Sequence, residues 1–226
     1  MFEQIAEQVP QFFNRHNLVF ILEAMGRTLG MTFIGCGVGF VFGFMIAVLR
    51  QSRSRLLLPG RALAIAYVET FRRIPFLVIL FIVLFVIEPL MPGTSLFGIA
   101  TVSVCLLSTA FLSEIIRSGI ESVPELQAEG ARALNFSYLQ MLIMIILPQS
   151  WKVILPPAAA FIVMFIKDTS LASQLGVIEL TFAGKMLVNR GFSPVLGFGA
   201  ILVCYFALSY PLSRFAAHLE KRLAAS

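Results

Sequence analysis

The feature that most constrains this chain is a series of five apolar segments, each long enough to cross a lipid bilayer. About 20 residues of α-helix span the hydrocarbon core of a membrane. Of the 226 residues, 58% are hydrophobic and 13% charged, whereas about 25% of a soluble domain is charged. The sequence therefore predicts an all-α integral membrane protein with about five transmembrane helices in a single domain over residues 1–226. The segments cover residues 18–49, 62–86, 96–116, 142–166 and 195–212.

Three glycines stand four residues apart in the first apolar segment, at Gly35, Gly39 and Gly43. Small residues at this spacing let two helices approach each other closely in lipid. We expect these glycines to pack the first span against another helix of the same chain.

The reactive residue types do not form a catalytic or metal-binding pattern. The cysteines Cys36, Cys105 and Cys204 lie in apolar segments without the spacing of metal ligands. The two histidines, His16 and His218, lie at opposite ends of the chain, and the sequence has no phosphate-binding Gly-x-x-x-x-Gly-Lys-Ser/Thr loop. We expect no enzyme activity, no metal and no cofactor bound by this chain. The net charge of +5 is typical of basic membrane-protein loops, so we expect no nucleic-acid partner.

The basic residues of the short loops predict the orientation of the chain in the membrane. Four arginines lie between residues 50 and 61, and the loop 88–95 has no lysine or arginine. Three basic residues lie in the tail 214–222. Because lysine and arginine concentrate in cytoplasmic loops, the N-terminus is expected outside and the C-terminus in the cytoplasm. The polar loop 121–139 is then cytoplasmic.

This polar loop has the composition of a short surface helix between two membrane spans. Ser122 and Glu125 have the spacing of a capping box, which predicts that the helix starts at Ser122. Asn135 tolerates the left-handed backbone conformation that often ends helices, so it predicts where this helix stops. Small residues between these positions offer a surface that fits a partner's groove with little loss of side-chain entropy. They are Ala128, Gly130, Ala131 and Ala133.

The order of residues in this loop resembles the EAA loop of ABC-importer permeases. Glu129 takes the Glu place, Gly130 and Ala131 take the two Ala places, and Asn135 takes the Gly place. A matching Ile-x-Leu-Pro tail follows at residues 145–148. The two departures, Gly for Ala and Asn for Gly, keep small size or turn geometry. The resemblance implies that a pair of cytoplasmic ABC ATPases grips this coupling helix. The implied coupling residues are Glu125, Ala128, Glu129, Gly130, Ala131 and Asn135.

Further motifs resemble those of the polar amino-acid permeases, the histidine/glutamate/glutamine-type family of ABC importers. They lie at residues 67–75, 113–127, 147–149 and 167–171, and the match covers roughly 67–222. The resemblance implies a type I ABC importer fold in the bacterial cytoplasmic (inner) membrane. It also implies a second permease copy or a related permease, and an extracytoplasmic binding protein that delivers a polar amino acid. ATP and Mg would be used by the separate ATPase subunit.

Charged residues near the predicted cytoplasmic boundary have the spacing of helix-face pairs. Glu69 lies three and four residues before Arg72 and Arg73, and Glu114 lies three residues before Arg117. Charges at membrane depth are costly and tend to pair inside the helix bundle. We therefore expect a structural role for these charges.

The polar run Lys167–Ser170 ends the fourth apolar segment, in which Pro156 and Pro157 are expected to break the helix. Both charge signs and two hydroxyls beside a broken helix would suit the zwitterion of an amino acid. The alternative is an interfacial helix cap. Phe161 stands where several relatives carry Glu, so either the substrate is not cationic or a second permease supplies the charge. The candidate pathway residues are Phe161, Lys167, Asp168, Thr169 and Ser170.

Three other classes of protein are alternatives to an importer permease. An ion-gradient-driven secondary amino-acid transporter would show repeated halves, and no clear repeat is visible. A membrane enzyme needs a reactive cluster at one depth. A structural or channel subunit would not need the cytoplasmic loop motif. The sequence leaves open which amino acid is carried, and whether the permease is a homodimer or a heterodimer.

Overall fold

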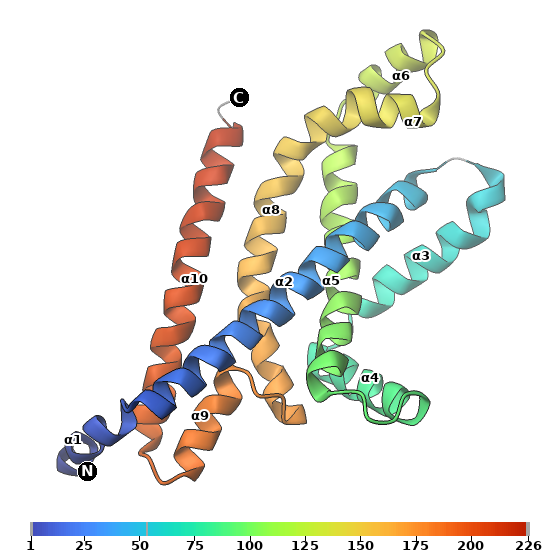
Figure 1. The fold of residues 1–226 in the computed structure, drawn as a ribbon. Helices are drawn as coiled ribbons and strands as arrows, with labels where there is room; N and C mark the ends of the chain where they lie inside the picture. Colours follow the sequence, from blue (N-terminus) through green and yellow to red (C-terminus); the bar gives the residue numbers. More distant parts are fainter. Residues whose placement is uncertain (1, 53, 225–226) are drawn as a thin grey trace. The chain divides into compact units, whose positions relative to one another are not determined.

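The computed structural model describes residues 2–52 and 54–224, and all the regular secondary structure in this part of the chain is helical (Figure 1). The described residues form two compact units. The first unit comprises residues 2–35, 74–105 and 163–212, and the second comprises 36–73, 106–162 and 213–224. Four helices contribute residues to both units. They are α2 (Arg15–Gln51), α5 (Leu96–Glu121), α8 (Leu147–Asp168) and α10 (Pro194–Ala224).

The first unit is built around a cluster of buried apolar residues. Its own helices are α1 (Phe2–Phe12), α4 (Phe76–Leu90), the 3-10 helix η3 (Thr169–Leu175) and α9 (Leu180–Asn189). The cluster is formed by residues of α1, α2, α9 and α10. Its buried members are Phe12, Ile21, Ala24, Leu180, Ala183, Leu187 and Ile201.

The start of α9 is anchored by Glu179, whose side chain is fully buried. One carboxylate oxygen accepts a hydrogen bond from the Phe182 N–H at 2.7 Å. The other accepts from the Thr181 N–H and from the Tyr205 hydroxyl, both at 2.9 Å. Burial raises the pKa of Glu179, and these three hydrogen bonds to the carboxylate offset part of that rise.

The second unit carries the polar loop. Its own helices are η1 (Arg55–Leu57), α3 (Leu58–Phe71), α6 (Glu125–Ala133), α7 (Tyr138–Met141) and the π-helix η2 (Leu142–Ile146). A buried apolar cluster joins parts of α2, α5 and α8 to α6, α7 and η2. Its members are Ala47, Ile116, Ile120, Ala131, Met141, Leu142, Ile146 and Ile154.

The glycines of α2 pack against α5, which confirms the prediction of close packing within the chain. In the second unit, a Cβ at Gly43 would lie 2.8 Å from the backbone nitrogen of Ser113, and a Cβ at Gly39 would collide with Ser108. In the first unit, a Cβ at Gly35 would collide with Val104. Only glycine permits this approach of the two helices.

Among the described residues, four helical segments are long and apolar enough to cross a membrane, or five if the interrupted pair α3 and α4 counts as one span. The expectation of one continuous helix over residues 62–86 is wrong, because α3 ends at Phe71 and α4 begins at Phe76. Pro75 has no N–H for the helical ladder, and its ring disfavours helical backbone at Ile74.

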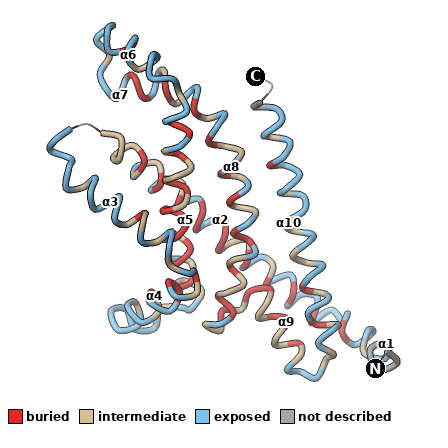
Figure 2. The backbone as a smooth tube through the Cα atoms, turned by 180° about the vertical axis from the view of Figure 1, so that it is seen from behind, coloured by how far each residue is buried: buried red, intermediate tan, exposed pale blue. Residues whose placement is uncertain are grey.

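The expectation of a helix broken at Pro156 and Pro157 is also wrong, since α8 continues through both prolines to Asp168. Prolines are tolerated inside transmembrane helices when neighbouring groups satisfy the freed carbonyls. Figure 2 shows much of α10 as exposed. Its exposed residues include the large apolar Leu202 and Phe206. Such a surface suits contact with lipid.

Candidate functional site

The polar loop begins where α5 ends, and its helix starts later than predicted. The residue before α6 is Pro124, whose side chain makes no capping hydrogen bond. The Ser122 hydroxyl instead donates to the carbonyl of Gly119 at 2.7 Å, so Ser122 still belongs to the end of α5. The prediction that Ser122 caps the coupling helix is therefore wrong. Proline fits this position because its fixed φ suits the entry to a helix and its missing N–H is not needed there.

A true capping box lies at the other end of the loop, where α7 begins. The Ser137 hydroxyl accepts from the Gln140 N–H at 3.3 Å, and the Gln140 side chain accepts from the Ser137 N–H at 2.9 Å. These reciprocal bonds satisfy two backbone donors at the start of α7. The signal was present in the sequence as Ser137-x-x-Gln140 directly before the apolar run that begins at Met141.

The end of α6 confirms the prediction made from Asn135. This residue has φ of 57°, and it is the one non-glycine residue with positive φ in the described part of the chain. The Asn135 N–H donates to the carbonyl of Arg132 at 2.9 Å, and the Phe136 N–H donates to Ala131 at 3.0 Å. These two bonds form a Schellman motif, which satisfies the last carbonyls of the helix.

The α6 helix has one face packed on its own unit and one face exposed. Ala131 is only 2% exposed, and Ala128 packs partly against the same cluster. The prediction that all the small residues form one contact surface is therefore wrong for Ala131, whereas Ala128 keeps part of its surface exposed. Two large apolar side chains that the sequence reading passed over are exposed instead, Leu126 at 77% and Leu134 at 73%. Their signal was an apolar residue in an otherwise polar loop.

The other predicted coupling residues lie on the exposed part of α6. Glu125, Glu129 and Gly130 are all exposed. A Cβ at Gly130 would have no atom within 4 Å, so the glycine is not required by packing. The exposed surface of α6 thus combines two carboxylates, a small residue and two leucines.

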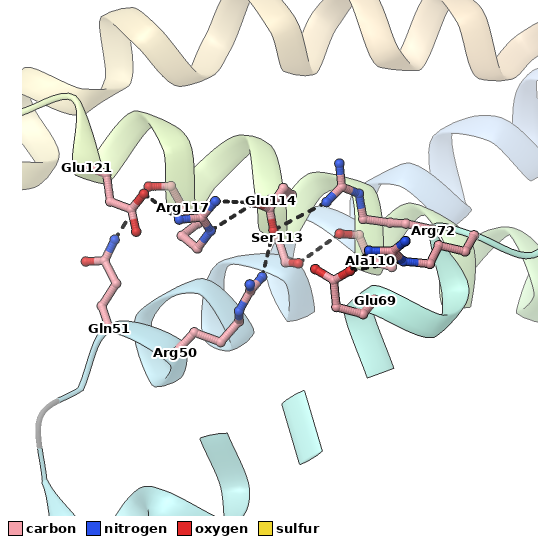
Figure 3. Close-up of polar contacts among 10 residues, drawn as sticks. Arg50, Gln51, Glu69, Arg72, Ala110, Ser113, Glu114, Arg117 and Glu121 are labelled. Carbon is pink, nitrogen blue, oxygen red and sulfur yellow. Dashed lines mark hydrogen bonds and ion pairs between the residues drawn. The ribbon is translucent and has the colours of Figure 1, made fainter. Parts of the chain in front are cut away.

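A cluster of ion pairs lies next to this loop, centred on Glu114 of α5 (Figure 3). One Glu114 oxygen accepts a hydrogen bond from Arg50 of α2 at 2.7 Å, and the other accepts from Arg117 one turn further along α5. Arg72, which follows α3, approaches Glu114 to 3.6 Å. The Glu114 and Arg50 side chains are only 19% and 11% exposed. One carboxylate therefore joins three segments of the second unit.

The predicted pairing of Glu114 with Arg117 is confirmed, and Arg117 also pairs with Glu121 at the start of the polar loop. Glu69 pairs with Arg73 at 2.6 Å, which decides between the two partners left open by the sequence. Sequence reasoning missed Arg50, because nothing in the local pattern indicates a partner 64 residues away.

The candidate pathway residue Phe161 is 6% exposed and stacks on Phe111 of α5, with ring centroids 5.5 Å apart. The guanidinium carbon of Arg72 lies 5.7 Å from the centroid of the Phe111 ring, within the range of a cation–π interaction. Phe161 therefore belongs to a packed aromatic pair and is not presented to an open space.

The polar run Lys167–Ser170 covers the end of α8 and the start of η3, and it contains both exposed and buried residues of the first unit. Lys167 is exposed, and Asp168 and Ser170 are half-buried. Thr169 is fully buried, and its hydroxyl donates to the carbonyl of Ile166 at 2.7 Å. Its expected place in a polar cavity is therefore not seen, whereas Lys167, Asp168 and Ser170 keep part of their surface exposed. Across residues 2–52 and 54–224, no group of three metal-binding side chains comes together.

Solved structures share this fold along nearly the whole chain. One described as an amino acid ABC transporter with histidines matches with a TM-score of 0.83 and 23% identity, over 96% of this chain and 98% of that chain. The inward-facing MetNI methionine ABC transporter matches with a TM-score of 0.80 and 19% identity, over 93% and 99%. These matches establish an all-helical fold of the type I ABC importer permeases.

Sequence comparison gives the same class. Residues 39–225 match the family described as binding-protein-dependent transport system inner membrane component. The chain is 31% identical over 215 residues to the probable glutamine ABC transporter permease protein GlnP of Bacillus subtilis (strain 168), covering 93% of this chain and 96% of the relative. It is 35% identical over 205 residues to the probable amino-acid ABC transporter permease protein YckA of the same organism, covering 91% and 89%.

The fold and the loop therefore define a multi-pass membrane permease of the ABC importer class, and the alternative of a secondary transporter is not supported. The chain belongs to the family of binding-protein-dependent transport system inner membrane components. The resemblance found in the sequence motifs is confirmed.

Proposed function

We propose that this chain forms the translocation pathway for a polar amino acid in an ATP-driven importer. The observation that carries the proposal is the exposed α6 helix, closed by Asn135 and flanked by the Glu114 cluster, in a chain about one third identical to permeases named for glutamine and other amino acids. A binding protein delivers the substrate on the outer side. A second permease, identical or related, completes the pathway.

The ATPase subunits grip the exposed face of α6. Glu125, Glu129 and Gly130 lie on this face, together with the two exposed leucines. Ala128 and Ala131 attach α6 to its own unit, and the turn at Asn135 directs the chain into the next span. The ATPase subunits use ATP and Mg, and their ATP-driven closure moves α6 of this chain.

The proposed orientation places α6 in the cytoplasm and the N-terminus outside. The support is the distribution of arginine and lysine, which concentrates near residues 50–61 and in the tail. The membrane is the bacterial cytoplasmic (inner) membrane, in keeping with a family described as an inner membrane component. The substrate is zwitterionic, with Lys167, Asp168 and Ser170 as its candidate contacts, because both charge signs and a hydroxyl are available there.

The test is transport by a reconstituted complex. The chain is co-purified with its ATPase and any second permease, placed in liposomes, and supplied with a labelled amino-acid panel with and without ATP and binding protein. Uptake that requires both ATP and binding protein is expected, and it names the substrate. Uptake that ignores ATP and follows an ion gradient would refute the proposal.

The role of α6 is tested in the same complex by Glu129→Lys. This change places a positive charge on the proposed ATPase contact, so we expect normal membrane insertion and loss of transport-linked ATP hydrolysis. Glu220→Lys is the matched control, because Glu220 is also exposed but lies near the end of α10. Equal ATP hydrolysis by the two variants would remove α6 from the proposal.

A further inference from the structure

Arg72 occupies an unusual position between two different groups on α5. Its guanidinium approaches the Glu114 carboxylate to 3.6 Å and lies 5.7 Å from the Phe111 ring centroid. Phe111 and Glu114 are three residues apart, so they lie on the same face of α5. Arg72 therefore contacts the charge cluster and the aromatic pair at the same time.

The two contacts connect Arg72 to two different parts of the second unit. Glu114 is paired with Arg117, and Arg117 with Glu121, which is the last residue of α5 and the first of the polar loop. Phe111 stacks on Phe161, a buried residue of α8. Arg72 thus contacts both the chain of ion pairs that reaches the polar loop and the aromatic pair that reaches α8.

The attachments of Glu114 differ in strength. Arg50 makes a hydrogen-bonded ion pair at 2.7 Å, whereas the 3.6 Å separation of Arg72 exceeds hydrogen-bond distance. The Arg72 side chain is also 35% exposed, compared with 11% for Arg50. Loss of the Arg72 contact is therefore less costly, so α3 is the segment that can detach while α2 stays fixed.

A second contact limits how α3 can move against α5. The Tyr67 hydroxyl donates to the carbonyl of Leu106 at 2.5 Å, more than one turn before the end of α3. With Tyr67 as the fixed point, movement concentrates at the end that carries Arg72. A planar guanidinium suits this end, because it can pair with a carboxylate and lie over a ring, whereas a lysine ammonium has no plane to stack.

We infer that Arg72 is a positioning residue that latches the end of α3 to α5, so that a movement of the polar loop changes the packing of Phe111 on Phe161. The inference rests on the proposed function, since it assigns to Arg72 the step between ATPase contact and the pathway. Arg72 acts through Phe111 and Glu114 and need not contact the substrate.

The test compares Arg72→Met with Arg73→Met in the complete reconstituted complex. Arg73 is the matched control, because its side chain is 77% exposed and pairs with Glu69 rather than Glu114. We expect Arg72→Met to assemble and hydrolyse ATP but to carry about threefold to tenfold less amino acid per ATP, given the usual size of cation–π and coupling energies. Arg73→Met should match the wild type, and Arg72→Lys should recover only part of the loss.

A double-variant comparison gives a readout that a merely structural role would not move. Adding Phe111→Leu to Arg72→Met should lower uptake per ATP little further, because both changes break the same contact. Adding Phe111→Leu to Arg73→Met should give the product of the two single effects. Equal uptake per ATP in Arg72→Met and Arg73→Met would overturn the latch. Failure of Arg72→Met to assemble would also overturn it, as would independent effects of the two changes in both double variants. Absence of ATP-dependent uptake by the wild-type complex would instead refute the proposed function.

Discussion

Replacing Glu114 with glutamine should destabilise the chain far more than the same replacement at Glu69. Glu114→Gln keeps the size and shape of the side chain but removes the charge that holds Arg50 and Arg117. The Glu114 side chain is 19% exposed, so the arginines would lose their partner in a place where water replaces it poorly. The Glu69–Arg73 pair is 43% and 77% exposed, so water can take over its role.

The magnitude follows from the contacts. Hydrogen bonds to charged groups contribute about 1.5–3 kcal/mol each, and breaking a buried ion pair costs about 3–5 kcal/mol. Glutamine keeps one acceptor oxygen and the site is partly exposed, which reduces the cost to about 2–4 kcal/mol. The Arg72 contact at 3.6 Å adds little. For Glu69→Gln we expect a much smaller effect, because solvent screens an exposed pair.

The assay is thermal unfolding in detergent, followed as the fraction of chain that stays monodisperse on size exclusion after heating. About 1 kcal/mol shifts the midpoint of a chain of this size by about 2–4 °C, so Glu114→Gln should lower it by roughly 5–15 °C. Glu69→Gln should lower it much less. Equal shifts for the two variants would refute the conclusion that Glu114 holds the second unit together.

Three further predictions use the same unfolding assay. Gly43→Ala should lower the free energy of unfolding by about 1–3 kcal/mol, because the added Cβ would meet the backbone of Ser113. Gly37→Ala should leave it unchanged, because a Cβ there has no atom within 4 Å. Equal unfolding midpoints for the two variants would contradict the close packing at Gly43. Asn135→Ala should lower the free energy of unfolding by about 1 kcal/mol, because alanine is strained at a φ of 57°. Asn135→Gly should not lower it. An alanine variant more stable than the glycine variant would contradict the left-handed turn. Burial raises the pKa of Glu179 above its ordinary value of 4.5, so the wild type should gain stability relative to Glu179→Gln as pH falls from the raised pKa toward 4.5. A wild-type advantage that shrinks over that range would contradict the sign.

Local patterns predicted the elements that depend on neighbouring residues alone. The apolar segments predicted membrane helices, and Asn135 predicted the end of α6 because a left-handed turn is a property of one residue. The motif order across the loop predicted the family. The start of α6 was misplaced at Ser122, because a capping pattern describes a favourable start and does not exclude a better one at Pro124.

The contacts between distant residues were beyond the sequence. Arg50 and Glu114 are 64 residues apart, and no local spacing brings them together. The two faces of α6 were misjudged for the same reason, since an alanine such as Ala131 reads equally well as a buried or an exposed residue until its neighbours are known.

The sequence by itself determined that this chain is a helical membrane protein with an ABC-permease loop, because apolar length, turn-forming residues and motif order act locally along the chain. The tertiary structure alone decided which charges meet at Glu114, which face of α6 is exposed, and how Arg72 lies between Glu114 and Phe111. These depend on the positions of separate helices, and helix packing is set by the fit of many side chains at once rather than by any single segment.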